Sequence, residues 1–212
     1  MTAEPARGQA RADDPGAART AAPLAALVER IEDDTRLDAA VAALDRIARP
    51  LHRRRGLRSA LRGERIGHAL HPLLTDVPLG TWMSATVLDL AGGRRARPAA
   101  RLLLGVGVAA AVPTVVTGVA EWQAAGPRAR RVGIAHGVVN SAGLVLYALS
   151  LVARLRGRHR RGVVLALSGA GVVSVGGYLG GHLSLVHKVG TADPRLLDRA
   201  DPGGEGAAPG GD

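Results

Sequence analysis

The sequence predicts an all-α membrane protein: a four-helix transmembrane up-down bundle preceded by an amphipathic helical segment. Two observations lead to this fold class. Long apolar segments occupy residues 102–120, 132–153 and 162–186 and contain no Asp, Glu, Lys or Arg, and each reaches the roughly 20 residues with which a helix crosses a bilayer. The connections between these segments are short, so consecutive helices must run in opposite directions.

A fourth span is predicted before these three, at about residues 72–92. This segment contains Asp76 and Asp89, but its centre from Val77 to Leu88 is uncharged. An even number of spans also gives every apolar helix an antiparallel neighbour. The sequence therefore predicts a four-helix transmembrane domain over residues 67–189.

The segments outside this domain are of two kinds. Residues 1–23 and 190–212 are rich in Ala, Pro, Gly, Asp and Arg and predict disordered tails. Residues 24–66 have apolar residues at helical spacing with a break near Asp34, and six arginines between residues 53 and 65. Such an amphipathic and basic segment is typical of a helix lying on an anionic membrane surface, although a solvated basic linker fits the last part equally well.

Composition excludes several classes of function. Cysteine is absent, which rules out disulfides and any metal centre held by thiolates. A formal net charge of +10 could indicate nucleic acid, but the arginines lie mostly beside apolar runs, where they anchor helices in lipid. We therefore expect the lipid bilayer, and no nucleic acid, as a partner. Thirteen Arg and Lys residues flank the spans on the side of the two termini against nine on the other, which favours cytoplasmic termini in a multi-pass protein of the cell membrane.

The up-down arrangement gathers most polar residues of the bundle at one face, where the first and third spans begin and the second and fourth end. In chain order these residues are His68, His71, Asp76, Thr117, Glu121, Trp122, His136, Asn140, Tyr178 and His182. From the helical rise, His136 and His182 lie at similar depth. An ionisable group inside a span usually faces a cavity, a partner or a cofactor.

We predict that His136 and His182 bind haem b or a metal ion. The further predicted cofactor-binding residues are His71, Asp76 and Asn140. Of these, Asn140 lies one turn from His136 on the same helix face. Simpler alternatives exist for two of them: His71 can be solvated at the membrane surface, and Asp76 can cap its helix.

Glycines recur in the fourth span from Gly169 to Gly181. Pairs of small residues four positions apart let helices approach closely, which is the simpler explanation. A further possibility is that a glycine face beside His182 leaves room for a flat cofactor. No phosphate loop, nucleophile elbow or zincin motif occurs in the sequence, so an enzyme acting alone is not expected.

Four motifs resemble those of an uncharacterised bacterial membrane family, a domain of unknown function. These motifs are Gly67–Trp82, followed by Leu88–Leu90, then Gly118–Trp122, Arg130–Asn140 and Gly176–His182. The first has the pattern G-x-x-x-H-P-x-x-x-D-x-P. In similar proteins this module often precedes a Rieske-type iron–sulfur domain, which implies a place in electron transfer. This chain lacks the cysteines of such a cluster, so any redox partner would be a separate polypeptide.

One leading hypothesis and two alternatives follow. In the leading hypothesis, a four-helix membrane module binds haem or a metal ion and supports electron transfer. In the first alternative, the chain is a non-redox membrane anchor or assembly module, and its polar cluster only holds the helices together. In the second, it is a small transporter or proton channel. An absorption spectrum with metal analysis separates the first hypothesis from the others, and liposome flux identifies the last.

Overall fold

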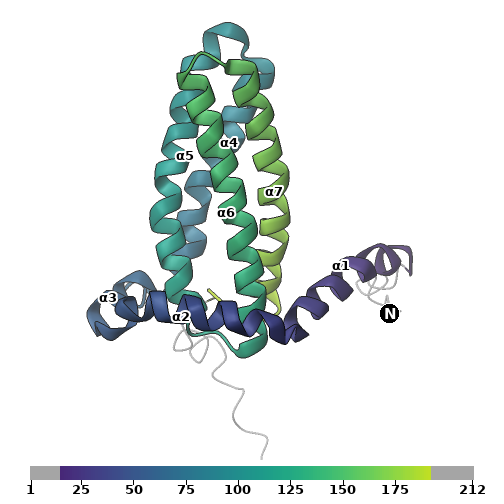
Figure 1. The fold of residues 1–212 in the computed structure, drawn as a ribbon, viewed down its shortest axis with the longest axis vertical. Helices are drawn as coiled ribbons and strands as arrows, with labels where there is room; N and C mark the ends of the chain where they lie inside the picture. The colour runs from purple at the N-terminus through teal and green to yellow at the C-terminus, as the bar shows by residue number, and fades with distance from the viewer. Residues whose placement is uncertain (1–14, 192–212) are drawn as a thin grey trace, which may run out of the picture.

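The computed structural model describes residues 15–191, which form helices and connecting turns with no strand among them (Figure 1). Short helices precede four long ones. The elements in chain order are α1 (Pro15–Asp33), the 3-10 turn η1 (Thr35–Leu37), α2 (Asp38–Arg53), α3 (Arg55–Leu61), α4 (Leu70–Ala91), α5 (Gly93–Trp122), α6 (Pro127–Leu155) and α7 (His159–Leu185).

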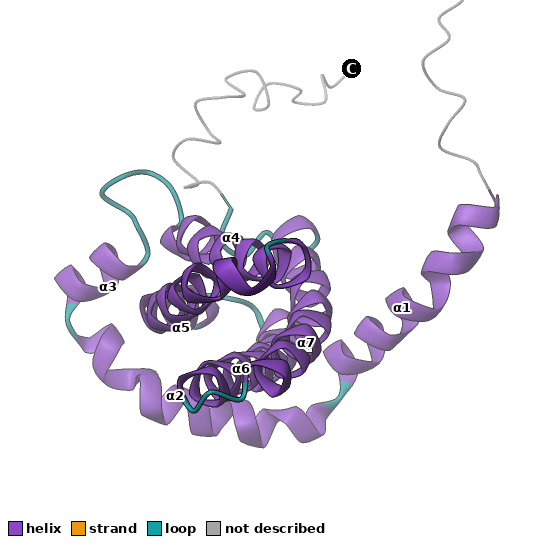
Figure 2. Cartoon of the chain, turned by 90° about the horizontal axis from the view of Figure 1, so that it is seen from above, coloured by secondary structure: helices purple, strands orange, loops and turns teal. Residues whose placement is uncertain are grey.

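The four long helices lie side by side and run alternately up and down (Figures 1 and 2). Each packs against its neighbour in the chain, and α4 also packs against α7. Very short connections enforce this order: Gly92 joins α4 to α5, residues 123–126 join α5 to α6, and residues 156–158 join α6 to α7. This arrangement gives the bundle two distinct ends, one of which carries the N-terminal helices.

Three helices of the described chain are long and apolar enough to cross a membrane, namely α5, α6 and α7. Helix α4 has 22 residues, a length of about 33 Å at the usual helical rise. Asp76 and Asp89 lower its hydropathy, and the fourth crossing therefore stays a prediction.

The positions of the two termini test the fourth crossing. Reporters fused at residue 1 and after residue 212 are expected to report the same compartment, because four crossings return the chain to the side on which it began. Paired fusions of a periplasmically active and a cytoplasmically active reporter provide the measurement. Opposite compartments would mean that α4 lies on the membrane without crossing it.

We call helices α1, α2 and α3, with η1, the belt, and the end of the bundle against which they lie the belt end. The belt curves around the belt end of the bundle (Figure 2). Helix α1 contacts α6, α2 contacts α5 and α6, and α3 contacts α5. The break expected near Asp34 is present, since α1 ends at Asp33 and the Asp34 carboxylate accepts a hydrogen bond from the Arg36 amide at 3.0 Å.

The predicted N-terminal tail differs from the structure in its last part. Residues 15–23, expected to be disordered, belong to α1. This stretch is rich in alanine, the residue with the highest helix propensity, and it continues directly into the amphipathic pattern of α1. The rest of the two predicted tails, residues 1–14 and 192–212, lies outside the described residues.

Small residues let the long helices of the bundle pack closely. Trp82 of α4 stacks on Tyr147 of α6, with ring centroids 4.0 Å apart and planes 16° from parallel. A Cβ atom at Gly107 of α5 would collide with the Trp82 ring. A second apolar cluster at the belt end includes the fully buried Val28 of α1, so part of the belt shares a core with α6 and α7.

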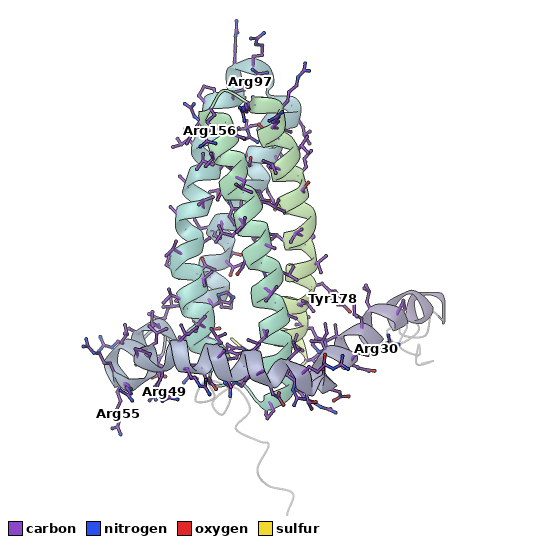
Figure 3. All side chains as sticks on the ribbon, in the orientation of Figure 1. Arg30, Arg49, Arg55, Arg97, Arg156 and Tyr178 are labelled. Atoms are coloured by element: carbon purple, nitrogen blue, oxygen red, sulfur yellow. The ribbon has the colours of Figure 1, made fainter. Side chains whose placement is uncertain are left out.

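Arginines gather at both ends of the molecule (Figure 3). Arg30, Arg49 and Arg55 lie on the belt, while Arg97 and Arg156 lie at the opposite end, near the α4–α5 and α6–α7 connections. We call this opposite end the arginine end. Apolar helix surface separates the two ends, as expected of a bundle that faces lipid between two charged surfaces.

Candidate functional site

A cluster of one carboxylate and two imidazoles joins the belt to the bundle. Oε1 of Glu32, at the end of α1, lies 2.7 Å from Nε2 of His182 and 2.8 Å from Nε2 of His187. His182 is in the last turn of α7, and His187 follows that helix. Because a carboxylate can only accept, each Nε2 carries a hydrogen and donates it to Glu32. One oxygen atom therefore fixes two imidazole rings.

The turn that follows α7 brings His187 back toward the last turn of that helix. Lys188 has a φ of 56°, a left-handed conformation, and the amide of Val189 donates to the carbonyl of Leu183 at 2.9 Å. This bond closes a turn of seven residues, one more than a Schellman turn contains. The turn brings the His187 ring to 5.3 Å from the His182 ring, measured between centroids.

Apolar and ionic contacts hold α1 in place beside these imidazoles. Val28, one turn before Glu32, is 1% exposed and packs in the cluster that includes Val132 and Leu179. Arg131 of α6 donates to both carboxylate oxygens of Asp38 at 2.7 and 3.0 Å and to the backbone carbonyl of Glu32 at 2.8 Å. The position of the Glu32 carboxylate is thus set by the fold around it.

The charges around the cluster favour an ionised carboxylate. Burial by itself would raise the pKa of Glu32, but the hydrogen bonds from His182 and His187 and the charge of these imidazoles outweigh it and hold that pKa below its usual range. The Arg131 hydrogen bond likewise lowers the pKa of Asp38. The Glu32 carboxylate is therefore anionic at neutral pH.

The donor atoms of Glu32, His182 and His187 all lie within 4.8 Å of one another, a spacing at which one metal ion could contact all three. Metal–ligand bonds to imidazole nitrogen and carboxylate oxygen are about 2.0–2.2 Å long. The present contacts are hydrogen bonds, so an ion would replace the two Nε2 protons and spread the donors slightly. Three protein ligands leave at least one coordination position open.

His136 and His71 belong to a separate group inside the bundle. Nδ1 of His136 donates to the carbonyl of Gly176 at 2.9 Å, and Nδ1 of His71 donates to the carbonyl of Thr114 at 2.8 Å. Their ring centroids are 6.2 Å apart. The Asn140 amide lies 3.3 and 3.4 Å from the two ring nitrogens of His136 and donates to the His136 carbonyl at 2.9 Å. The two histidine bonds join α6 to α7 and α4 to α5, whereas the Asn140 bonds stay within α6.

The structure does not bring His136 and His182 together as the ligand pair expected from the sequence. His136 packs against Gly180, whose Cβ position would lie 2.9 Å from the imidazole. His182 is two residues further along α7, about 200° around the helix at roughly 100° per residue. It therefore faces the belt, on the side of α7 away from His136. Equal depth does not imply a shared face.

The glycine face of α7 is filled by side chains from α6. A Cβ atom at Gly176 would lie 2.5 Å from the Asn140 amide atoms, and Gly180 meets His136 in the same way. Close helix packing therefore accounts for Gly176 and Gly180, whereas nothing lies within 4 Å of the Cβ positions of Gly171, Gly177 and Gly181.

Two adjacent glycines of α7 provide a matched test of this packing. Gly176→Ala is expected to destabilise the protein by about 1–3 kcal/mol, because the added methyl group meets Asn140 and overpacks the interface. Gly177→Ala is expected to be neutral or slightly stabilising, since nothing lies within 4 Å of its Cβ position. Unfolding in mixed micelles followed by circular dichroism measures both, and equal effects would contradict the packing role.

The remaining polar residues of the belt end are divided between the bundle and its surface. Asp76 is exposed on α4 and belongs to neither histidine group. Glu121 is buried at 8% exposure and accepts a hydrogen bond from the His71 amide at 3.0 Å, so it caps the first turn of α4. Tyr178 is 44% exposed, on the surface of α7 (Figure 3).

Comparison with known proteins identifies the bundle. A family model described as "Predicted membrane protein (DUF2231)" matches residues 67–193. This chain belongs to the DUF2231 family. The match includes all four long helices and confirms a multi-pass membrane protein in contact with the lipid bilayer. No curated protein and no solved structure matches the chain.

The DUF2231 match divides the Glu32–His182–His187 cluster. Both imidazoles lie within the matched residues, whereas Glu32 and the whole belt precede them. The carboxylate therefore comes from a segment outside the family domain.

Sequence reasoning missed Glu32 and His187, although a signal for Glu32 was present. Val28 and Glu32 are four residues apart and share one face of a helix, so Glu32 lies in the apolar stripe of an amphipathic helix. An acid on that face needs a polar partner. His187 gave no comparable signal, because it lies beyond the predicted span.

Proposed function

We propose that this DUF2231 protein is a metal-binding membrane module in which Glu32, His182 and His187 hold one divalent first-row transition metal ion. The observation that supports the proposal is the convergence of two imidazole nitrogens, at 2.7 and 2.8 Å, on a single carboxylate oxygen. Two imidazoles and one carboxylate suit zinc, iron, copper and nickel. The site joins the belt to the bundle, so binding the ion would also fix the belt.

The residues fit an ion better than haem b, the other cofactor that the sequence predicts. Haem bound through His136 and His182 would need both imidazoles on one side of α7, and they lie on opposite sides. The glycine surface next to His136 is filled by that imidazole and by Asn140. An ion needs only the three donor atoms that already lie together.

Electron transfer is the proposed role of the module when the ion is redox-active. Iron or copper would supply one-electron chemistry, whereas zinc would not, since it has no redox chemistry. What the chain itself contributes is the donor set, the open coordination position and a location at the belt end of the bundle. A separate redox protein would approach from that side, which we propose to be cytoplasmic because of the excess of Arg and Lys around the spans there.

A non-redox anchor or assembly module is the second candidate, and the ionic contacts of the belt favour it. Besides the Arg131–Asp38 pair, Arg128 pairs with Asp33 at 2.8 Å and Arg130 pairs with Asp45. In this role the Glu32 hydrogen bonds only attach the belt. The third hypothesis, a small transporter or proton channel, rests on the sequence pattern and is tested by flux in liposomes.

Zinc titration of the purified full chain tests the leading proposal. Isothermal calorimetry of the protein in detergent is expected to show one saturable site, in which each imidazole binds the ion through Nε2 and carries its proton on Nδ1. Glu32→Gln is expected to weaken binding by more than about 10-fold, since a neutral amide oxygen replaces an anionic ligand. Glu29→Gln, one turn earlier on the same helix and exposed, should leave the affinity unchanged. Equal affinities for the two variants would remove Glu32 from the site and favour the anchor.

A further inference from the structure

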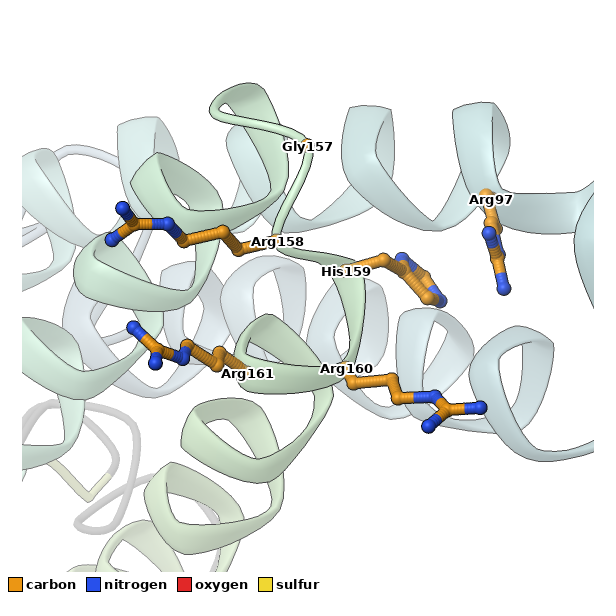
Figure 4. Close-up of a pocket in the computed structure, with 6 residues that line it drawn as sticks. All are labelled: Arg97, Gly157, Arg158, His159, Arg160 and Arg161. Carbon is orange, nitrogen blue, oxygen red and sulfur yellow. The ribbon is translucent and has the colours of Figure 1, made fainter.

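The arginine end of the bundle has a surface depression lined almost wholly by basic side chains (Figure 4). Its volume is about 450 Å³. The lining residues come from the start of α5, the α6–α7 connection and the start of α7: Arg97, Gly157, Arg158, His159, Arg160 and Arg161.

A second hollow of about 210 Å³ adjoins the first and extends the basic lining. It shares Arg97, Gly157 and His159 with the first hollow and adds Arg101 and Arg154. The two hollows thus form one continuous basic surface, which reaches from the outside of the bundle to the buried Arg154.

The positive charge of this end has a single acidic counterpart. Residues 93–101 and 154–161 contain nine arginines, whereas Asp89 is the only acid within residues 77–120 and 141–185. Arg154 holds Asp89 through two hydrogen bonds of 2.7 and 2.5 Å, and both side chains are 2% exposed. The one carboxylate is therefore already neutralised by a buried guanidinium, and the charge of the exposed arginines remains.

The start of α7 increases this positive potential. Arg158 occupies the N-cap position without a side-chain hydrogen bond to the helix, and no acid lies in the first turn. Instead, Arg160 and Arg161 follow there. Cations near a helix N-terminus are electrostatically unfavourable, since the helix dipole is positive at that end. An anion in the hollow would relieve both the repulsion among the arginines and their repulsion by the dipole.

The position of the hollow along the bundle axis indicates which anion would bind there. It lies where the apolar lengths of α5 and α7 begin, because uncharged residues follow Arg101 in α5 and Arg161 in α7. Lipid phosphates lie at this level, next to the ends of membrane-spanning helices. Guanidinium groups bind phosphate oxygens through paired hydrogen bonds.

We propose that this hollow binds a phosphate group, carried by the headgroup of an anionic phospholipid. Arg97 from α5 and His159 and Arg160 from the start of α7, which extend to the same side of the α6–α7 connection in Figure 4, contact the phosphate oxygens. The bound lipid joins the α4–α5 and α6–α7 connections at the end of the bundle that has no belt.

Native mass spectrometry of the full chain in detergent tests this proposal, with phosphatidylglycerol and phosphatidylcholine as probes. The wild type is expected to bind one phosphatidylglycerol in preference to phosphatidylcholine. The double variant Arg97→Gln/Arg160→Gln is expected to lose about 25-fold in affinity, since each arginine near an anionic headgroup contributes about fivefold. Arg49→Gln/Arg55→Gln, on the exposed belt surface, is the charge-matched control and should bind as the wild type does.

Inorganic phosphate at about 10 mM competes with the lipid headgroup for the guanidinium groups. Its effect on lipid binding separates the two sources of phosphate. Retention of phosphatidylglycerol in its presence identifies the lipid as the ligand, and displacement that depends on Arg97 and Arg160 identifies a free phosphate bound by the same chemistry. Equal lipid affinity in the wild type and in Arg97→Gln/Arg160→Gln, or no preference for phosphatidylglycerol over phosphatidylcholine, would overturn the proposal. The four substituted arginines, Arg97, Arg160, Arg49 and Arg55, are all exposed, so unchanged melting curves will show that the variants are folded.

Discussion

Replacing His187 with alanine is expected to lower the zinc affinity of the purified protein by more than about 100-fold, and His182→Ala is expected to do the same. Each change removes a direct ligand, which costs more than the 10–100-fold typical of losing a group that only orients a ligand. Competition with a chromophoric chelator measures affinities over this range. The two imidazoles and Glu32 form one site. The affinity of the double variant His182→Ala/His187→Ala should therefore be little lower than that of either single variant.

His136→Ala is the informative control for these variants. Its imidazole is bonded to the Gly176 carbonyl and lies on the other side of α7 from His182, so zinc affinity should stay at the wild-type value even if the fold loses some stability. His159→Ala, at the arginine end, should also leave it unchanged. Loss of zinc binding in His136→Ala with retention in His187→Ala would restore the ligand pair expected from the sequence.

Replacing Asp89 with asparagine is expected to destabilise the protein by about 3–5 kcal/mol. Asp89 and Arg154 are each 2% exposed and form a two-bond ion pair between α4 and α6, and removing one partner leaves a buried charge without compensation. Unfolding in mixed micelles, monitored by circular dichroism, gives the difference in free energy.

Two further variants make this result specific to the ion pair. Arg156→Gln, two residues from Arg154 and exposed, should change the stability by less than about 0.5 kcal/mol. Asp89→Leu combined with Arg154→Met should recover much of the loss, because replacing both charges by apolar groups of similar volume is often neutral. A loss below about 1 kcal/mol for Asp89→Asn would show that Arg154 finds another partner or water.

The sequence predicted the long helices because a charge-free run of about 20 residues has few alternatives to a membrane helix. It also predicted that the polar groups would gather at one end, since short connections force consecutive helices to alternate in direction. Glu121 and His182 lie at the belt end, in the last turns of α5 and α7, whereas Asn140 lies near the middle of α6. The composition of residues 15–23 predicts disorder, but their alanines also favour the helix that begins at Pro15.

Which of the polar residues contact one another could not be predicted from the sequence. Depth along a helix follows from counting residues, but which side of the helix a residue faces depends on the neighbours that each side contacts. Gly176 and Gly180 show that α6 covers one side of α7, and His182 lies on the other. Its partner Glu32 is 150 residues away in the chain, in a segment whose docking position no local pattern specifies.

X-ray absorption spectroscopy of the zinc-loaded protein tests the central claim most directly, because it identifies the atoms bound to the metal. We expect two imidazole nitrogens and one carboxylate oxygen at about 2.0–2.2 Å, with an added water in the open position, and the outer-shell scattering typical of imidazole. In Glu32→Gln the carboxylate contribution should disappear. A shell of water oxygens without imidazole scattering would contradict a metal site built from Glu32, His182 and His187.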